Sequence, residues 1–499
     1  MDNDDLYRKF ASIPKGLIIA PAGYGKTHTI VESLIFSEGR QLVLTHTNAG
    51  VASIKEKIRK HNPPIPTWRY NIETIDGYVQ KYVLAFCFKE IIPDQKDRKE
   101  YYSFLRERAA SLFNNKLVSS VINSTYSGLY VDEYQDCTKS QHKLIECLSK
   151  VLPTHIIADP LQGIFDFDGQ LVDFDKDLVD FSIVGKLDRP WRWEKTNVAL
   201  GLSLSKIRQD IESGKQINLL DLSNSAEIKI RDSSQYSYLE NAKYLYNEVS
   251  KIIDNSNQLL IIHPVSSRIE ARLTFCKQFS GRVSVIESVD DNDFYEYSQK
   301  IDNLVKSNDL YADLLLILKG EPSTRKKSKT KTRKRTLLTG LSFLKDGKPP
   351  SGKTSMAHCF TELLSNFDFI KLRSLLVILY KTTGVNCYRK ELFWDLARSL
   401  SIAGTDDVSV LNAMESVRNK KRGQCKKNYG KTIGTTLLTK GLEFDTVVVL
   451  DAHKFVDSKN LYVALTRAST KLIVFSDNGT LGPFNAFDKN VVSVVKVNR

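Results

Sequence analysis

One segment near the start of the chain limits the possible folds more than any other. The apolar run GLIIA at residues 16–20 leads into APAGYGKT at residues 20–27, and HTIVESLIF then opens a helix. The order strand, glycine-rich turn, helix presents backbone amides to a phosphate group. The pattern GxxxxGK[ST] is met, except that Ala20 stands at the first glycine. We therefore expect an α/β fold built around a phosphate-binding loop, with a tight turn that binds nothing as the alternative.

The residue types of this loop suit a bound nucleotide. Gly23 and Gly25 allow amides to converge on a β-phosphate, Lys26 reaches the β and γ phosphates, and Thr27 offers a hydroxyl to Mg²⁺. The predicted nucleotide-binding residues of the loop are Ala22, Gly23, Tyr24, Gly25, Lys26, Thr27 and His28.

A second match to the same pattern predicts something different. GKPPSGKT at residues 347–354 fits letter by letter, but no apolar strand precedes it. Pro349 and Pro350 also remove two amide donors from the loop that would surround a phosphate. We expect an ordinary exposed loop there.

Carboxylates that could act on a nucleotide follow another strand signal, in LYVDEYQD at residues 129–136. Asp132 is suited to bind Mg²⁺ together with Thr27, and Glu133 to polarise the attacking water. Such a pair is weak evidence by itself, and the phosphate loop strengthens it.

Apolar runs divide the chain into two α/β regions. Candidate parallel strands lie at residues 16–20, 41–45, 128–131, 154–158, 258–263, 446–451 and 471–475, with helices at 49–60 and 139–151 between some of them. At 499 residues the chain has room for about three domains. We expect a first lobe at 1–84 and 126–185 with a small helical insertion at 85–125. The second lobe is expected at 186–300 and 430–499, interrupted by a helix-rich insertion at 301–429.

The net charge of +14 is concentrated in two short runs. Residues 325–335 read RKKSKTKTRKR and residues 418–431 read RNKKRGQCKKNYGK. Each run is either a solvated loop or a phosphate-contacting loop whose attraction for nucleic acid depends on salt.

Cysteine usage and hydropathy favour a cytoplasmic protein without a membrane segment. The seven cysteines are scattered with no CxxC pair, so neither a disulfide framework nor a zinc cluster is indicated. No run approaches the length of a membrane span, and the first residues, MDNDD, are acidic.

An ordered series of motifs links these segments. After the phosphate loop come THTNAG (45–50), TIDGY (74–78), DEYQD (132–136), ADPLQGIFDFDG (158–169), LDRPWRW (187–193), TTLLTKGLEFD (435–445) and LYVALTRA (461–468). This set resembles the UvrD/Rep/PcrA group of superfamily 1 helicases. The resemblance implies two RecA-like P-loop lobes, with ATP and Mg²⁺ between them and single-stranded DNA across their upper surface.

The resemblance also assigns roles to individual residues. Gln162 would sense the γ-phosphate, Arg192 and Arg467 would act as arginine fingers, and Gly441 and Glu443 would complete the nucleotide site near the ribose. The implied catalytic set is Lys26, Asp132, Glu133, Gln162, Arg192 and Arg467. Guanidinium groups can stabilise the charge that spreads over a transferred phosphoryl group.

The implied DNA contacts come from both lobes. They are Thr45, Asn48, Thr74, Thr435 and the base-stacking rings of Phe165 and Phe167. The two phenylalanines could equally be core residues. Trp191 and Trp193 flank Arg192 and could either stack or pack.

Several positions depart from the family pattern. No glutamine stands upstream of the phosphate loop, Asp168 replaces an arginine, Leu437 replaces a histidine, and Pro190 and Trp191 precede the arginine finger. The hydrolytic residues are thus intact, whereas the residues that couple to DNA are only partly so.

Two hypotheses follow from the motif set and from these departures. The first is an ATP-dependent translocase or helicase that moves 3′ to 5′ on single-stranded or tailed duplex DNA. The second is a nucleotide-dependent regulatory subunit with little unwinding activity and a nuclease partner. It is motivated by the departures and by a compact length similar to the helicase-like subunit of the Gabija anti-phage system.

Overall fold

The computed structural model describes most of the chain, namely residues 3–87, 91–93, 98–164, 169–231, 246–264, 269–286, 292–319, 337–422, 430–482 and 484. The chain divides into two compact units. The first contains residues 1–231, 423–427 and 440–499, and the second contains residues 232–422 and 428–439.

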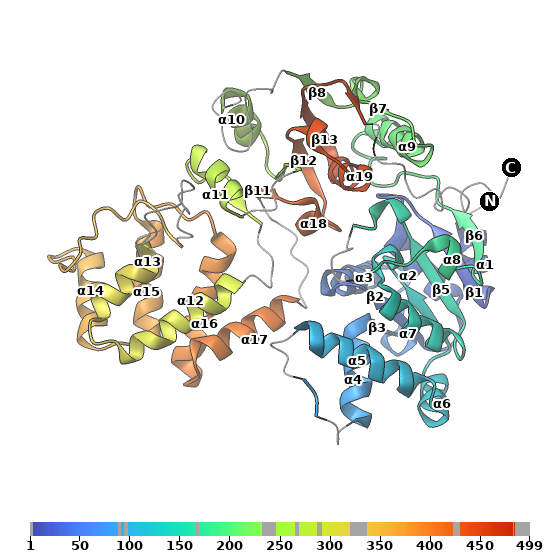
Figure 1. The fold of residues 1–499 in the computed structure, drawn as a ribbon, viewed down its shortest axis with the longest axis horizontal. Helices are drawn as coiled ribbons and strands as arrows, with labels where there is room; N and C mark the ends of the chain where they lie inside the picture. Colours follow the sequence, from blue (N-terminus) through green and yellow to red (C-terminus); the bar gives the residue numbers. More distant parts are fainter. Residues whose placement is uncertain are drawn as a thin grey trace. The chain divides into compact units, whose positions relative to one another are not determined.

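The first lobe is built on a six-stranded parallel sheet of order β3-β2-β4-β5-β1-β6 (Figure 1). Its strands are β1 (Lys15–Ile19), β2 (Gln41–Thr45), β3 (Tyr70–Thr74), β4 (Gly128–Val131), β5 (Thr154–Ala158) and β6 (Ser182–Lys186). Strands β2, β4 and β5 are buried along their whole length. A parallel sheet that is covered on both faces requires such apolar runs.

Helices cover both faces of this sheet. The core cluster on one face includes Val43, Ile54 and Tyr130, and it is covered by α1 (Asn3–Ser12), α2 (Lys26–Phe36) and α3 (Asn48–Lys60). The core cluster on the other face is covered by α4 (Ile75–Phe86), α5 (Arg98–Phe113), α6 (Lys116–Thr125) and α7 (Lys139–Ser149). The short helix α8 (Phe174–Asp177) precedes β6.

Six further strands make up a second parallel sheet. Within the first unit β13 (Ala468–Ser476) pairs with β12 (Phe444–Val449) and β8 (Glu227–Ile230); within the second, β11 (Lys431–Gly434) pairs with β9 (Leu259–Ile262) and β10 (Ser284–Val285). Helices of this region are α9 (Val198–Glu212), α10 (Tyr246–Asn255), α11 (Ile269–Gln278), α18 (Thr436–Thr439) and α19 (Ser458–Leu465). A small antiparallel pair, β7 (Ile217–Asn218) with β14 (Thr480–Leu481), completes the strands described.

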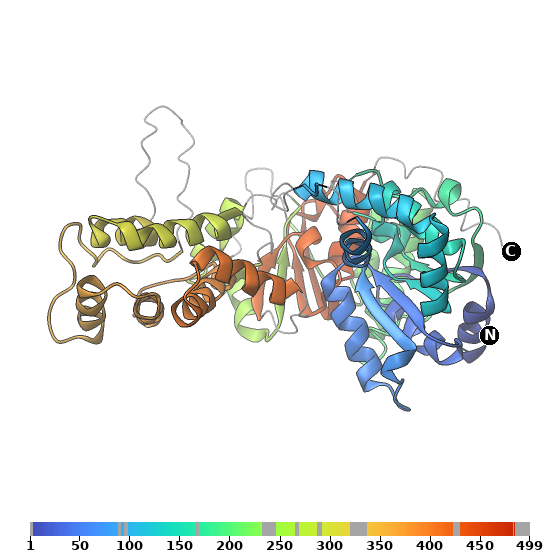
Figure 2. The same ribbon diagram turned by 90° about the horizontal axis from the view of Figure 1, so that it is seen from below.

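A helical body occupies much of the second unit. It consists of α12 (Asn292–Asn303), α13 (Leu310–Lys319), α14 (Ser355–Ser365), α15 (Phe369–Lys381), α16 (Lys390–Asp406) and α17 (Val410–Arg422), which lie side by side in Figure 2. One apolar cluster, from Phe294 to Met414, holds these helices together. Arg389 is fully buried within the body and forms an ion pair with Asp293.

The predicted fold class is confirmed: the protein is α/β, with two parallel sheets flanked by helices and a helix-rich insertion. All seven apolar runs are strands. The second GKT match is an exposed loop, as expected, and its Thr354 caps α14 by accepting a hydrogen bond from Ala357 N. Among the described helices, none is both long and apolar enough to cross a membrane.

Candidate functional site

The phosphate loop leaves β1 in the interior of the first sheet, because β1 pairs with β5 on one side and β6 on the other. Gly25, with φ 90°, is the N-cap residue of α2, and no side chain caps this helix. The amides of its first turn therefore remain open to an anion, and the helix dipole adds to their attraction. Lys26 begins α2 and is almost completely buried.

Both the backbone conformation at residue 23 and the side chains around it require a glycine there. Its φ is 76°, and a Cβ at this position would lie 2.7 Å from the Trp193 ring. Trp193 is buried and donates from Nε1 to the carbonyl of Ala468 at 2.7 Å. The amide of Arg192 donates to the carbonyl of Gly23 at 3.0 Å. The LDRPWRW segment therefore packs directly on the phosphate loop.

Two carboxylates follow β4 and face this loop. Thr27 Oγ1 lies 3.5 Å from Asp132 Oδ2, and Lys26 Nζ lies 3.4 Å from Glu133 Oε2. Burial, reinforced by the Glu133 carboxylate, raises the pKa of Asp132 to about 7. Burial also opposes ionisation of Glu133, but Lys26 and Lys440 outweigh it and lower the pKa of Glu133. The two neighbouring carboxyl groups thus differ in their readiness to lose a proton.

Gln162 lies in a chain of buried polar groups. Its Nε2 donates to Asp159 Oδ2 at 2.6 Å, and Arg467 Nη2 donates to its Oε1 at 3.5 Å. Asp159 also accepts from Arg208 Nη1 on α9 at 2.6 Å. Arg467 is held by the carbonyls of Val463 (2.9 Å) and Leu442 (3.1 Å). The side chain that is predicted to sense a γ-phosphate is therefore fixed at both ends.

The other predicted arginine finger pairs with the predicted ribose residue. Arg192 Nη2 lies 2.6 Å from Glu443 Oε1, and Nη1 donates to the carbonyl of Thr466. The Arg192 guanidinium is the main cause that lowers the pKa of Glu443, although burial acts against it. Gly441, with φ 78°, is exposed two residues earlier.

Two residues that sequence reasoning did not select, Lys440 and Lys57, also belong to this cluster. Lys440 is the lysine of the KGLE motif. It forms an ion pair with Asp136 and donates to the carbonyl of Gln162. The ammonium of Lys57 on α3 interacts with the carboxylates of Asp132 and Glu443, while desolvation lowers its pKa. A lysine at KGLE is visible in the sequence, but the sequence does not show its partner.

The sequence left open whether Trp191 and Trp193 stack or pack, and the structure distinguishes Trp191. Unlike Trp193 it is partly exposed, and its Cδ1 lies 3.3 Å from where a Cβ of Gly25 would stand. Its ring lies 6.2 Å from that of His28, and the Arg189 guanidinium lies over it at 3.7 Å. Trp193 is therefore a packing residue, and Trp191 presents an aromatic surface beside the phosphate loop.

Residues 88–174 match the family model of the UvrD/REP helicase N-terminal domain. This stretch includes β4, the two carboxylates and Gln162, and the match supports a UvrD-like, helicase-type function. A search of curated proteins found no match to the chain.

The remaining predicted nucleotide residues have clear surroundings. Ala22 is buried, and the Tyr24 hydroxyl is hydrogen-bonded to Ser205 of α9. His28 is about half exposed and lies 3.3 Å from Glu32. Burial is the main cause that lowers the pKa of His28. The amide of Tyr24 donates to the carbonyl of Pro21 at 3.2 Å, so both its hydroxyl and its amide have partners within the protein.

The predicted DNA contacts are less uniform. The Thr45 hydroxyl is buried beneath Gly50 without a hydrogen-bond partner, and the Thr74 hydroxyl caps α4 through Gly77 N at 3.0 Å. Asn48 is the partly exposed first residue of α3. Thr435 belongs to the second unit, where its hydroxyl accepts from Leu438 N. Phe165, Phe167 and Asp168 lie outside the described residues.

Side chains suited to Mg²⁺ are present beside the loop. Thr27 and Asp132 offer a hydroxyl and a carboxylate 3.5 Å apart, and oxygen is the ligand type that Mg²⁺ prefers. Among the described residues, no three histidine, cysteine, aspartate or glutamate side chains form a metal cluster. A two-ligand site completed by water and phosphate oxygens fits Mg²⁺ better than a zinc site.

Proposed function

We propose that the chain is an NTP-dependent translocase or helicase of the UvrD type that acts on single-stranded or tailed duplex DNA. ATP with Mg²⁺ is the proposed substrate, and the direction of movement is 3′ to 5′ by resemblance. The family match supports the helicase class, and the finer assignments are our inference.

One observation supports this proposal most strongly. Lys26, Glu133, Gln162, Arg192 and Arg467 belong to five separate segments, yet contacts within the first unit connect them into one mostly buried cluster, with Thr466 joining the two arginines. Cations, carboxylates and an amide in this arrangement are what phosphoryl transfer requires, since its transition state spreads negative charge over several oxygens. A purely structural cluster would not need an uncapped helix N-terminus beside it.

Each side chain has a role in the proposed reaction. Open amides of α2 and the Lys26 ammonium bind the β and γ phosphates, and Thr27 with Asp132 would hold Mg²⁺. The magnesium ion would neutralise developing charge on the phosphates. Glu133, whose pKa is lowered, accepts a proton from the attacking water. Arg192 and Arg467 stabilise charge on the transferred group.

Three residues orient the ends of the substrate. Gln162, held by Asp159, reports on the γ-phosphate. Trp191 offers its ring to the nucleobase beside His28, and Glu443 leaves Arg192 to meet the ribose. No upstream glutamine reads the base, so we propose that the preference between ATP and GTP is weak.

Steady-state hydrolysis of ATP and GTP, with and without single-stranded DNA, tests this function. We expect stimulation by DNA of about tenfold or more, and we expect Lys26→Ala to abolish turnover, because its ammonium neutralises the phosphates in the transition state. Lys9→Ala on the exposed side of α1 is the matched control. Turnover retained by Lys26→Ala would contradict the mechanism.

A second candidate function is the regulatory subunit of a nuclease-containing defence complex. Burial of the Thr45 hydroxyl and the capping role of the Thr74 hydroxyl favour it, since both side chains are less available to a DNA strand. Hydrolysis that is robust but indifferent to DNA would support this candidate over the first. Co-purification of a nuclease would identify the partner.

A further inference from the structure

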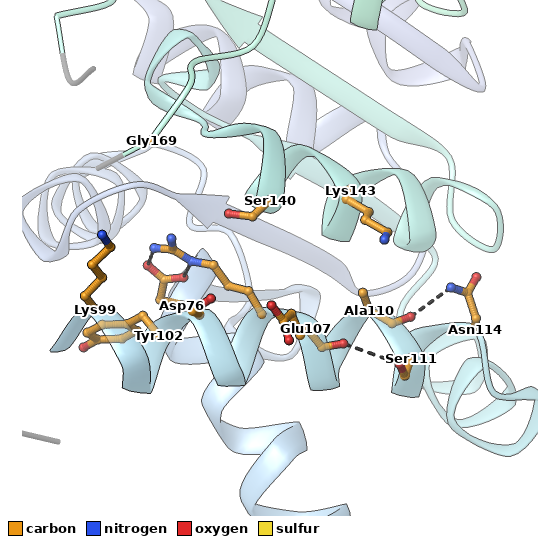
Figure 3. Close-up of a pocket in the computed structure, with 12 residues that line it drawn as sticks. Asp76, Lys99, Tyr102, Glu107, Ala110, Ser111, Asn114, Ser140, Lys143 and Gly169 are labelled. Carbon is orange, nitrogen blue, oxygen red and sulfur yellow. Dashed lines mark hydrogen bonds and ion pairs between the residues drawn. The ribbon is translucent and has the colours of Figure 1, made fainter. Parts of the chain in front are cut away.

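A groove separate from the nucleotide cluster lies between α5 and α7 in the first lobe (Figure 3). Its volume is about 1170 Å³. Residues spaced three and four apart along α5, including Lys99, Ser103 and Ser111, form one wall, and Ser140 with Lys143 of α7 faces them. Asn114, just beyond α5, lines the far end, so the groove follows about 22 Å of helix.

The charges of the groove are unbalanced. Arg106 binds Asp76 through two hydrogen bonds of 2.8 and 2.9 Å, which neutralises the only aspartate among the lining residues. Lys99 and Lys143 are exposed, and Glu107 is the one other acid in the lining. The ammonium of Lys150 joins the same wall through Asn114 at 3.3 Å. The net charge is therefore positive.

The remaining surfaces are polar or aromatic. Tyr102 is partly exposed, and the Arg106 guanidinium lies 5.9 Å from its ring. The hydroxyl of Ser103 can donate to phosphate or sugar oxygens. Ser111 Oγ donates to the carbonyl of Glu107 at 3.4 Å, and Ser140 Oγ lies 3.0 Å from Thr138 Oγ1. Lysines combined with an aromatic ring along an open groove are typical of sites for single-stranded nucleic acid, where bases stack and phosphates pair with cations. A docking site for a protein would be expected to have a more apolar centre.

The position of the groove agrees with this ligand. Asp76 lies two residues after Thr74, the predicted strand contact that caps α4. Gly169 also lines the groove, and it closely follows Phe165 and Phe167, for which base stacking is predicted. The groove thus begins where the predicted strand contacts of the first lobe end.

We propose that the groove between α5 and α7 binds a single nucleic-acid strand. Lys99 and Lys143 contact its phosphates, and Tyr102 stacks on one of its bases. The Arg106–Asp76 pair keeps a carboxylate from repelling the strand. This proposal rests on the proposed function and extends the DNA-contacting surface to residues for which the family resemblance implies no role.

The test is the affinity of the full chain for a fluorescent oligothymidylate, measured by anisotropy over a series of salt concentrations. Lys99→Ala/Lys143→Ala should weaken binding about tenfold or more. It should also reduce the slope of log affinity against log salt by about 1.4, since each lost phosphate contact removes about 0.7 for a single strand. Lys9→Ala/Lys215→Ala removes the same charge from exposed positions outside the groove and should match the wild-type chain.

Three further measurements separate an effect on binding from an effect on folding. Each variant is first compared with the wild-type chain by thermal unfolding. Tyr102→Phe should then retain affinity for oligothymidylate and oligoadenylate alike, whereas Tyr102→Leu should lower both, because stacking tolerates any base. A Ser103→Cys chain should react with a maleimide above the wild-type background, and saturating oligonucleotide should slow that reaction.

The outcomes are distinct. Wild-type affinity and salt slope in Lys99→Ala/Lys143→Ala, with Ser103→Cys left unprotected, would overturn the groove proposal and leave the proposed function standing. If Lys99→Ala/Lys143→Ala behaves as wild type and an acidic peptide, but no oligonucleotide, protects Ser103→Cys, the groove binds a protein partner. That outcome would also overturn the groove proposal. If the wild-type chain binds no oligonucleotide, the DNA part of the proposed function fails, and this proposal fails with it.

Discussion

Two tryptophans on either side of Arg192 show how single residues diverge within a short motif. Trp193 has its ring against Gly23 and its indole nitrogen on the carbonyl of Ala468, so it is fully satisfied inside the protein. Trp191 keeps a partly exposed ring near Gly25 and His28. Exposure of a large aromatic side chain beside a phosphate loop is what a nucleobase would use.

Substitution of Trp191 tests this interpretation. Trp191→Ala should raise the KM for ATP about tenfold, because the loss of a stacking ring costs about 1–3 kcal/mol per base. Turnover at saturation should change little, since the ring does not contact the transferred phosphate. Trp191→Phe should restore most of the affinity. Steady-state kinetics supply both constants, and an unchanged KM in Trp191→Ala would rule out stacking.

At the scale of elements, one ion pair joins α9 to the turn after β5. Arg208 is buried and lies 2.6 Å from Asp159 and 2.7 Å from Glu212. Burial opposes ionisation of Asp159, but the Arg208 guanidinium, helped by Lys26, holds the pKa of Asp159 below its usual value. Because Asp159 also receives a hydrogen bond from Gln162, α9 and the proposed γ-phosphate sensor share one carboxylate.

Arg208→Ala should therefore lower the free energy of unfolding by about 3–5 kcal/mol, since it leaves a buried carboxylate unpaired. The pair stabilises the fold above the unfolded-state pKa of Asp159, about 4, and its contribution is lost as the pH falls through the lower folded value. The difference in the free energy of unfolding between Arg208→Ala and the wild-type chain should therefore become smaller at acidic pH. Urea unfolding at several pH values measures this difference. A difference that stays constant with pH would contradict a stabilising role for the Arg208–Asp159 ion pair.

At the scale of the whole molecule, the distribution of charge matters more than its sum. The net charge of +14 is concentrated in the runs at 325–335 and 418–431. The first run lies outside the described residues, and the second is described only at its two ends. Both therefore remain a prediction from the sequence, with nucleic acid as the partner that such runs would attract.

Neutralising the eight basic residues of 325–335 should weaken DNA binding and flatten its dependence on salt, because each lost phosphate contact reduces counterion release. A chain with the same residues in shuffled order is the matched control and should bind as the wild type does. Anisotropy with an oligonucleotide between about 50 and 200 mM salt provides the measurement. Equal affinity of the neutralised and shuffled chains for DNA would mean that residues 325–335 are only a solvated loop.

Three strands that the sequence did not predict, β3, β6 and β8, lie at sheet edges and share a physical explanation. The edge strands β3 and β6 each have one fully buried residue, and the edge strand β8 has none. Edge strands have fewer neighbours to bury them, so they lack the continuous apolar run that marks β2 or β5. Strand β11 is well buried but has only four residues and follows a basic run.

The sequence by itself determined the phosphate loop, the carboxylates after β4 and the α/β class, because a strand, a turn and a helix in succession are local features that residue types specify directly. Only the tertiary structure paired Lys440 with Asp136, which lie 304 residues apart, and Arg208 with Asp159. It also distinguished Trp191 from Trp193. Long-range pairing and burial leave no local pattern, since each depends on which distant segment the fold brings near.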